Sequence, residues 1–259
     1  MMAEPRPIPT YPVLEGKVAL VTGGTRGIGA ATCRMLAANG VRVAVSARSQ
    51  EGVDALAAEL REAGTDAVGI MADVDTDQVE QLVMHTEREL GPIDILLPYA
   101  GGFDRFLPIE ELTEDYWRDP GVEPDLHLPC GEGGAAVDDR AGERGGRHDG
   151  LERRTLPGQA AHRTVRGGEG GVIQFTRHAA MELGPPGIRV NSIAPATVSS
   201  ERVERLMDAE SRARVADMSR LGRMGTPNDC ALATLFLVSD SSSWLTGVTL
   251  DIAGGRIML

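Results

Sequence analysis

The chain has few cysteines and no long apolar run, and each shortage excludes a class of protein. Its three cysteines, Cys33, Cys130 and Cys230, are odd in number and match no metal-ligand or disulfide spacing. No apolar stretch reaches the length of a membrane span, and the first residues lack the basic-then-apolar order of a signal peptide. We therefore expect a protein of the reducing cytoplasm that binds no metal and is not inserted in a membrane.

Positive charge is also scarce. The 259 residues carry 26 Lys and Arg against 38 Asp and Glu, which gives a net charge of −12. Such an acidic chain repels nucleic acid and anionic membrane surfaces, so neither is an expected partner. The length suits one α/β domain, expected over residues 14–259. Residues 1–13 are expected to form an exposed arm, because four prolines fall among the first twelve residues.

The most informative stretch is 18–29, with the sequence VALVTGGTRGIG. Residues 18–22 are all apolar or β-branched, as a strand buried on both faces requires. A glycine-rich turn follows, and then a helical pattern over 29–39 that Gly40 ends. Backbone N–H groups and the helix dipole favour a diphosphate at such a turn, and glycines let it approach. The alternative is a glycine turn that only reverses the chain, but the flanking strand and helix favour the phosphate site.

The spacing of Thr22, Gly23, Gly27 and Gly29 is T-G-x-x-x-G-x-G, and here the chain resembles the short-chain dehydrogenase/reductase family. The resemblance covers most of the chain except one segment. It implies an α/β fold with a Rossmann-like, doubly wound parallel sheet, a nicotinamide cofactor, and a Ser-Tyr-Lys catalytic group assisted by Asn. It also implies a homo-oligomer, because the last strand of relatives, here near 248–252, commonly packs against a partner subunit.

The residues after the second expected strand, 41–46, indicate which cofactor is used. Relatives that bind NAD place an acid there for the ribose 2′-hydroxyl. This chain has Ala47 followed by Arg48, and Arg26 of the glycine turn can converge on the same spot. Two guanidinium groups suit a 2′-phosphate through charge-assisted hydrogen bonds, which predicts NADP rather than NAD. The alternative is that both arginines are solvated surface charges.

The resemblance places further cofactor contacts at later strand ends. Residues 72–74 look like an adenine-contacting turn, although a lone Asp there can also cap a helix. The family's Asn-Asn-Ala-Gly is Pro-Tyr-Ala-Gly at 98–101, where small residues still allow close approach and Tyr99 is expected to pack. Residues 194–200 resemble the nicotinamide loop. The expected cofactor-binding residues are Gly23, Thr25, Arg26, Gly27, Ile28, Gly29, Ser46, Arg48, Asp73, Val74, Ala100, Gly101, Pro195, Val198 and Ser200.

Residues 201–220 are polar with a helical pattern, at the place where the family carries its substrate lid. They show no signature of a particular substrate. The resemblance therefore implies a small-molecule carbonyl or alcohol, and a ketoacyl thioester, a sugar, a steroid and a small ketone all stay open.

Residues 120–171 interrupt the family pattern. They contain 13 glycines and seven arginines, but no Ile, Met, Phe, Trp, Tyr, Lys, Ser or Asn. No strand or amphipathic helix is predicted in such a composition, although a doubly wound sheet needs a central strand and two helices here. The family's serine, tyrosine and lysine positions hold Glu152, Val165 and Glu169. No catalytic residue is therefore assigned.

A shifted reading frame in the gene accounts for this segment. When each codon is read one nucleotide later, the genetic code allows serine at positions 151 and 152, tyrosine at 165 and lysine at 169. Their spacing is that of the family's catalytic group. The alternative is a genuine flexible insert carrying His127, His148 and His162, whose spacing matches no metal site.

Two functions follow from these alternatives. With its frame repaired, the chain is predicted to be a carbonyl or alcohol oxidoreductase of the resembled family. As printed, it is predicted to be an inactive remnant or a cofactor-binding module, because a valine carries no proton for the substrate and a carboxylate at position 169 repels a tyrosinate.

Overall fold

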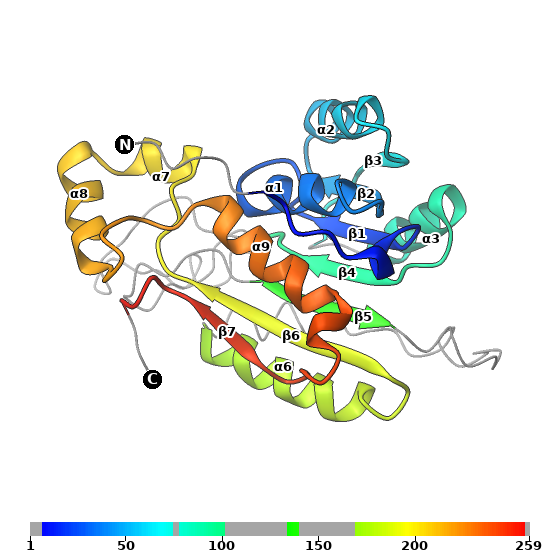
Figure 1. Cartoon of the computed structure of the whole chain (residues 1–259). Helices are drawn as coiled ribbons and strands as arrows, with labels where there is room; N and C mark the ends of the chain where they lie inside the picture. The colour runs from blue at the N-terminus through cyan, green and yellow to red at the C-terminus, as the bar shows by residue number, and fades with distance from the viewer. Residues whose placement is uncertain (1–6, 75–77, 102–133, 140–168, 257–259) are drawn as a thin grey trace, which may run out of the picture.

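The computed structural model describes residues 7–74, 78–101, 134–139 and 169–256. These contain one seven-stranded sheet in the order β3-β2-β1-β4-β5-β6-β7 (Figure 1). Its strands are β1 (Val18–Thr22), β2 (Arg42–Ala47), β3 (Ala67–Met71), β4 (Ile95–Pro98), β5 (Gly134–Asp139), β6 (Ile188–Pro195) and β7 (Thr249–Ile252). All neighbouring strands except β5 pair in parallel, and the predicted α/β class with a Rossmann-like sheet is confirmed.

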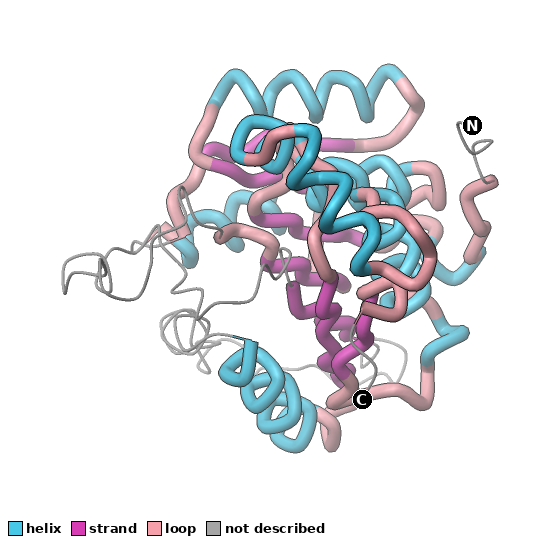
Figure 2. Tube along the Cα trace, turned by 90° about the vertical axis from the view of Figure 1, so that its left-hand side faces the viewer, coloured by secondary structure: helices cyan, strands magenta, loops and turns pink. Residues whose placement is uncertain are grey.

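Helices cover both faces of this sheet, as the edge-on view in Figure 2 shows. One face carries α1, α2 and α9, and the other carries α3 and α6. The helices are α1 (Gly27–Ala37), α2 (Gln50–Glu62), α3 (Val79–Leu90), α6 (Glu169–Leu183), α7 (Glu201–Leu206), α8 (Ala209–Met218) and α9 (Pro227–Val238), with 3₁₀ turns η1 (Pro12–Leu14) and η5 (Asp240–Ser242). None of the helices in the described residues is long and apolar enough to cross a membrane.

Strand β1 is buried on both faces, as its continuous apolar pattern predicts. Val18 and Leu20 pack with α3, whereas Ala19 and Val21 pack with α1, α2 and α9. Successive side chains of a strand point to opposite faces, so a strand between two helical layers needs apolar residues at every position. This buried strand therefore lies inside the sheet, and the glycine turn follows directly at its carboxyl end.

Strand β5 differs from the sequence prediction. No strand was expected within 120–171, yet Gly134–Asp139 forms one, and it runs antiparallel to both β4 and β6. Backbone N–H and C=O groups pair independently of side-chain type, and the facing edges of β4 and β6 need partners. The small and β-branched residues of GAAVDD allow this pairing, so the prediction that no strand lies in this segment is wrong for these six residues.

The helical pattern over 201–220 corresponds to two helices in the structure. Helix α7 ends at Leu206, and Asp208 begins α8 by accepting a hydrogen bond from the Ser211 backbone N–H at 2.8 Å. An aspartate in this position competes with continuation of a helix because its carboxylate satisfies a first-turn amide. In Figure 1 the two helices lie beyond the carboxyl ends of β6 and β7.

Candidate functional site

The glycine turn between β1 and α1 brings the backbone close to the end of β4. Gly23 has φ +65°, and a Cβ atom there would lie 2.6 Å from the Tyr99 carbonyl oxygen. A Cβ atom on Gly29 would meet the Gly23 carbonyl oxygen. Both positions therefore require glycine, one for its backbone conformation and both for close approach. No side chain caps the first turn of α1, which leaves its positive end accessible to an anion.

Ser46 of β2 lies beside this turn, because β1 and β2 are parallel neighbours. Ser46 is paired in register with Thr22, and the Ser46 carbonyl oxygen accepts a hydrogen bond from Gly24 N at 3.0 Å. The Ser46 side chain is fully buried, yet its Oγ has no hydrogen-bond partner in the part of the chain that the structure describes. A buried hydroxyl without a partner is costly, so a ligand that completes its hydrogen bonds fits here.

Arg26 and Arg48 both lie exposed at this edge of the sheet, one at the start of α1 and one just after β2. Neither forms a hydrogen bond or an ion pair with its side chain within the described ranges. Ser49 next to them caps α2, accepting from Gly52 N at 3.2 Å, and a Cβ atom on Gly52 would lie 3.3 Å from the Thr25 methyl carbon. The glycine turn and the start of α2 therefore adjoin, so the two segments that carry these arginines lie side by side.

The end of β4 is held by contacts that replace the family's asparagines. The Tyr99 hydroxyl hydrogen-bonds the Thr234 Oγ1 of α9 at 2.6 Å, and burial raises the pKa of Tyr99 far above its ordinary value. Ala100 N donates to the Thr22 Oγ1 at 3.3 Å, which joins β4 to β1. Tyr99 therefore has the contacts of a packing residue, and Ala100 and Gly101 stay at the edge of the glycine turn.

Two further strand ends carry the remaining expected residues. After β3, the backbone N–H of Asp73 donates to the Gln78 Oε1 at 3.1 Å, and Val74 packs against the α3 side of the core. After β6, the buried side chain of Val198 packs with Ile28 of α1, and Ser200 caps α7 by accepting from Val203 N at 3.4 Å. The Ser200 hydroxyl keeps its proton for donation to a ligand.

The fifteen expected cofactor residues thus gather at one edge of the sheet, because the carboxyl ends of parallel strands β1, β2, β3, β4 and β6 meet there. This edge is the usual ligand site of open α/β sheets. The residues fit a dinucleotide: the glycine turn leaves room that a Cβ would fill, and the Ser46 hydroxyl lacks a partner among the described residues.

The structure does not place a catalytic group. Positions 152 and 165, and the three histidines of the alternative interpretation, lie outside the described residues, and Glu169 is the first residue of α6. Among the described residues, no group of three or more His, Cys, Asp and Glu side chains could hold a metal ion.

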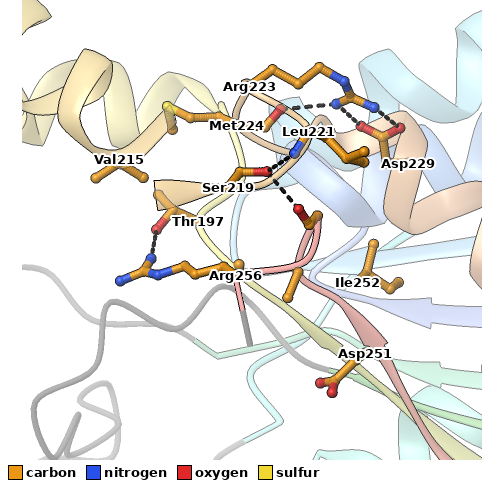
Figure 3. A pocket seen from close by; sticks show the side chains of 14 residues that line it. Thr197, Val215, Ser219, Leu221, Arg223, Met224, Asp229, Asp251, Ile252 and Arg256 are labelled. Carbon is orange, nitrogen blue, oxygen red and sulfur yellow. Dashed lines mark hydrogen bonds and ion pairs between the residues drawn. The ribbon is translucent and has the colours of Figure 1, made fainter. Parts of the chain in front are cut away.

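Sequence reasoning missed a pocket of about 250 Å³ at the ends of β6 and β7 (Figure 3). It is lined by parts of α8, the loop that leads to α9, and the chain after β7, including Arg256. No local sequence pattern predicts it, because its residues come from three separate stretches of the chain, 196–197, 215–229 and 251–256.

These features define a dinucleotide-binding α/β protein, and comparison with known proteins places it more narrowly. Residues 17–120 match the family model described as short chain dehydrogenase, and residues 153–256 match the model described as enoyl-(acyl carrier protein) reductase. The chain therefore belongs to the short-chain dehydrogenase/reductase family, whose members use NAD or NADP. Residues 121–152 fall outside both matched stretches.

Individual relatives agree with this assignment. The chain is 36% identical to a cis-4-hydroxycyclohexanecarboxylate dehydrogenase of Sinomonas cyclohexanicum, over 92% of this chain and 96% of the relative. It is 32% identical to the 3-oxoacyl-(acyl-carrier-protein) reductase FabG of Vibrio harveyi, over 95% and 99%. A solved short-chain dehydrogenase/reductase from Brucella melitensis has the same fold, with a TM-score of 0.74, 24% identity, and coverage of 97% of this chain and all of that one. The family assignment makes the protein an oxidoreductase of carbonyls and alcohols.

Proposed function

We propose that the gene encodes an NADP-preferring reductase or dehydrogenase that interconverts a small-molecule carbonyl and its alcohol. When bound, the nicotinamide would supply the hydride in carbonyl reduction and accept it in alcohol oxidation. Its diphosphate would lie at the glycine turn, one ribose at Ser46, the adenine at Asp73 and Val74, and the nicotinamide beside Ala100, Gly101 and the loop of Pro195, Val198 and Ser200. The named relatives are a cis-4-hydroxycyclohexanecarboxylate dehydrogenase and a 3-oxoacyl-(acyl-carrier-protein) reductase. Both support a carbonyl or alcohol substrate, and they do not indicate which one.

The preference for NADP is supported by one observation above the others. Arg26 and Arg48 are exposed, unpaired within the described ranges, and adjoin the start of α2, while position 47 holds Ala instead of an acid. A 2′-phosphate gains charge-assisted hydrogen bonds from both guanidinium groups, whereas a 2′-hydroxyl gains little.

The experiment is a fluorescence titration of NADPH and NADH against the parent chain, Arg26→Ala, Arg48→Ala and a control, Arg88→Ala on α3. Each of the first two variants is expected to weaken NADPH by about tenfold and to change NADH less than about twofold. The control removes a positive charge remote from the dinucleotide cradle, which is formed by the glycine turn 23–29 and the adjoining ends of β2 and β4, and it is expected to behave like the parent. Equal affinities of the parent for both cofactors would rule out the preference.

We also propose that residues 120–171 come from a shifted reading frame and that the printed chain is inactive. Residues 121–152 match neither family model, which supports the shift. The match to the second family model includes residues 153–171, the stretch that contains Val165 and Glu169. Loss of the proton donor alone costs about 10²–10⁴-fold in rate, and loss of the whole group costs more.

Sequencing the gene across codons 115–175 tests the shift directly, and activity assays of both chains test its consequence. The shifted-frame chain, which includes Glu152→Ser, Val165→Tyr and Glu169→Lys, is expected to oxidise or reduce a ketone–alcohol pair with NADP or NADPH. The printed chain is expected to give no turnover. Robust turnover by a printed chain whose mass confirms Val165 and Glu169 would contradict the proposal.

A second candidate function is a cofactor-binding module without catalysis. It is favoured by the combination of an intact glycine cradle with Glu152, Val165 and Glu169 at the catalytic positions. The same experiments separate the two, because a module binds NADPH in the printed frame and the sequenced gene then carries no shift.

The protein is further proposed to be a cytoplasmic homo-oligomer whose domain spans residues 14–259. Trp244 and Met181 are 97% and 77% exposed, and the loop after Trp244 abuts α6, since a Cβ on Gly247 would lie 3.4 Å from the Ala180 Cβ. Exposed tryptophan and methionine are typical of subunit interfaces. Sedimentation is expected to show a mass above the 27.5 kDa of one chain, reduced in Trp244→Glu.

A further inference from the structure

The pocket beyond β6 and β7 combines an apolar wall with a few polar groups (Figure 3). Its wall is formed by Val215 of α8, Leu221 and Met224 of the following loop, and Ile252 and Ala253 at the end of β7. Its volume of about 250 Å³ exceeds what one or two waters fill. The pocket can therefore take the body of a small organic molecule.

Two of the four charged side chains that line this pocket neutralise each other. Arg223 forms a paired contact with Asp229, with Nη1–Oδ2 and Nη2–Oδ1 distances of 2.7 and 2.8 Å. Asp251 is exposed to solvent, and Figure 3 shows its carboxylate well apart from the Arg256 guanidinium. Neither carboxylate is therefore a partner for Arg256.

Arg256 has no acidic partner among the described residues. It is half-buried, and its one side-chain hydrogen bond within the described ranges is a long contact of 3.4 Å from Nη1 to the Thr197 Oγ1. No Asp or Glu of those ranges lies within ion-pair distance of it. A partly desolvated guanidinium beside apolar surface gains most from a carboxylate that approaches along its planar edge.

The backbone holds Arg256 in place. Gly254 and Gly255 have φ +58° and +76°, and Arg256 N donates to the Ala253 carbonyl oxygen at 3.0 Å to close a turn. The Ser219 hydroxyl of the loop after α8 donates to the Gly254 carbonyl oxygen at 2.9 Å. The guanidinium is thus presented by a turn that is tied to the far wall of the pocket.

We propose that this pocket binds a small organic carboxylate, with its apolar body on the Val215, Leu221 and Ile252 wall and its carboxylate on Arg256. The site differs from the dinucleotide cradle, because none of the residues that line it is among the fifteen expected cofactor residues. Ala196 and Thr197 line the pocket, so its occupant touches the same loop that is expected to meet the nicotinamide. Binding at this site does not depend on the cofactor or on catalysis.

The test is calorimetric titration of the folded full-length chain with benzoate and with benzamide, its uncharged counterpart of the same shape. Benzoate is expected to bind at least about tenfold more tightly than benzamide, as a charge-assisted pair requires. Arg256→Gln is expected to abolish this difference. Arg205→Gln, which removes an exposed charge of α7 outside the pocket, is expected to leave it unchanged.

Three results would overturn the proposal. They are no benzoate binding, equal binding of benzoate and benzamide, and equal benzoate affinity in the parent and Arg256→Gln when both melt at the same temperature. Loss of benzoate binding in Arg48→Ala with no loss in Arg256→Gln would place the anion in the dinucleotide cradle and also refute it. None of these measurements involves turnover. A negative result would therefore refute the carboxylate site without bearing on the proposed oxidoreductase activity, and the reverse also holds.

Discussion

Replacing Gly23 by Ala tests how tightly the glycine turn is built against β4. Two costs are expected. Alanine at φ +65° has the left-handed backbone penalty of about 1–2 kcal/mol, partly offset by about 0.4–1 kcal/mol from a less flexible unfolded chain. The new Cβ would also lie 2.6 Å from the Tyr99 carbonyl oxygen and 2.8 Å from Ala100 N, both backbone atoms that cannot rotate away.

A matched control isolates the second cost. Gly16 has φ +76°, but a Cβ atom there has nothing within 4 Å, so Gly16→Ala carries the backbone penalty alone. Forcing extra volume into packed backbone costs about 1–3 kcal/mol. We therefore expect Gly23→Ala to lower the free energy of unfolding by about 2 kcal/mol more than Gly16→Ala does.

Urea unfolding, followed by circular dichroism, measures the free energy of unfolding of both variants. Titration with NADPH measures their cofactor affinity. Gly23→Ala is expected to weaken NADPH as well, since relieving the contact moves Ala100 away from the turn, whereas Gly16→Ala is not. Equal destabilisation by the two substitutions would show that the turn is not packed against β4 and would refute the cradle geometry.

Three other predictions use the same unfolding assay. Ser46→Ala is expected to raise the free energy of unfolding by about 1 kcal/mol, because it removes a buried hydroxyl that has no partner in the described structure, yet to weaken NADPH about fivefold; unchanged NADPH affinity would contradict this. The hydrogen bond from Arg223 lowers the pKa of Asp229 to about 2. The stability that the ionised Asp229 gives the folded protein is therefore complete above its ordinary pKa near 4 and is lost as pH falls towards 2. Asp229→Asn should therefore cost about 1 kcal/mol at pH 7, after allowance for solvent screening, with a smaller cost towards pH 2; a constant cost would contradict it. Arg189 is 7% exposed and donates to the Leu237 carbonyl oxygen at 2.7 Å, so Arg189→Met should cost at least about 3 kcal/mol, and a cost below about 1 kcal/mol would contradict that role.

The amino-acid sequence by itself determined the parts of this protein that depend on neighbouring residues. The continuous apolar run of Val18–Thr22, the glycine turn after it and the helix α1 were predicted within a residue or two, because strand burial, turn conformation and helix termination are local properties. The order of strands and glycine spacing likewise led to the family before any contact was known. The cofactor residues share one edge of the sheet because parallel strands end there.

Only the tertiary structure decided features whose partners are distant in the chain. The antiparallel pairing of β5 depends on the facing edges of β4 and β6, which no property of GAAVDD specifies. The buried Arg189 has an ordinary polar sequence context, and its role comes from carbonyl groups about fifty residues later. Arg256 is an unremarkable charge until the turn after β7 brings it to Thr197. Long-range hydrogen bonds and packing set these positions, and a local pattern carries no information about them.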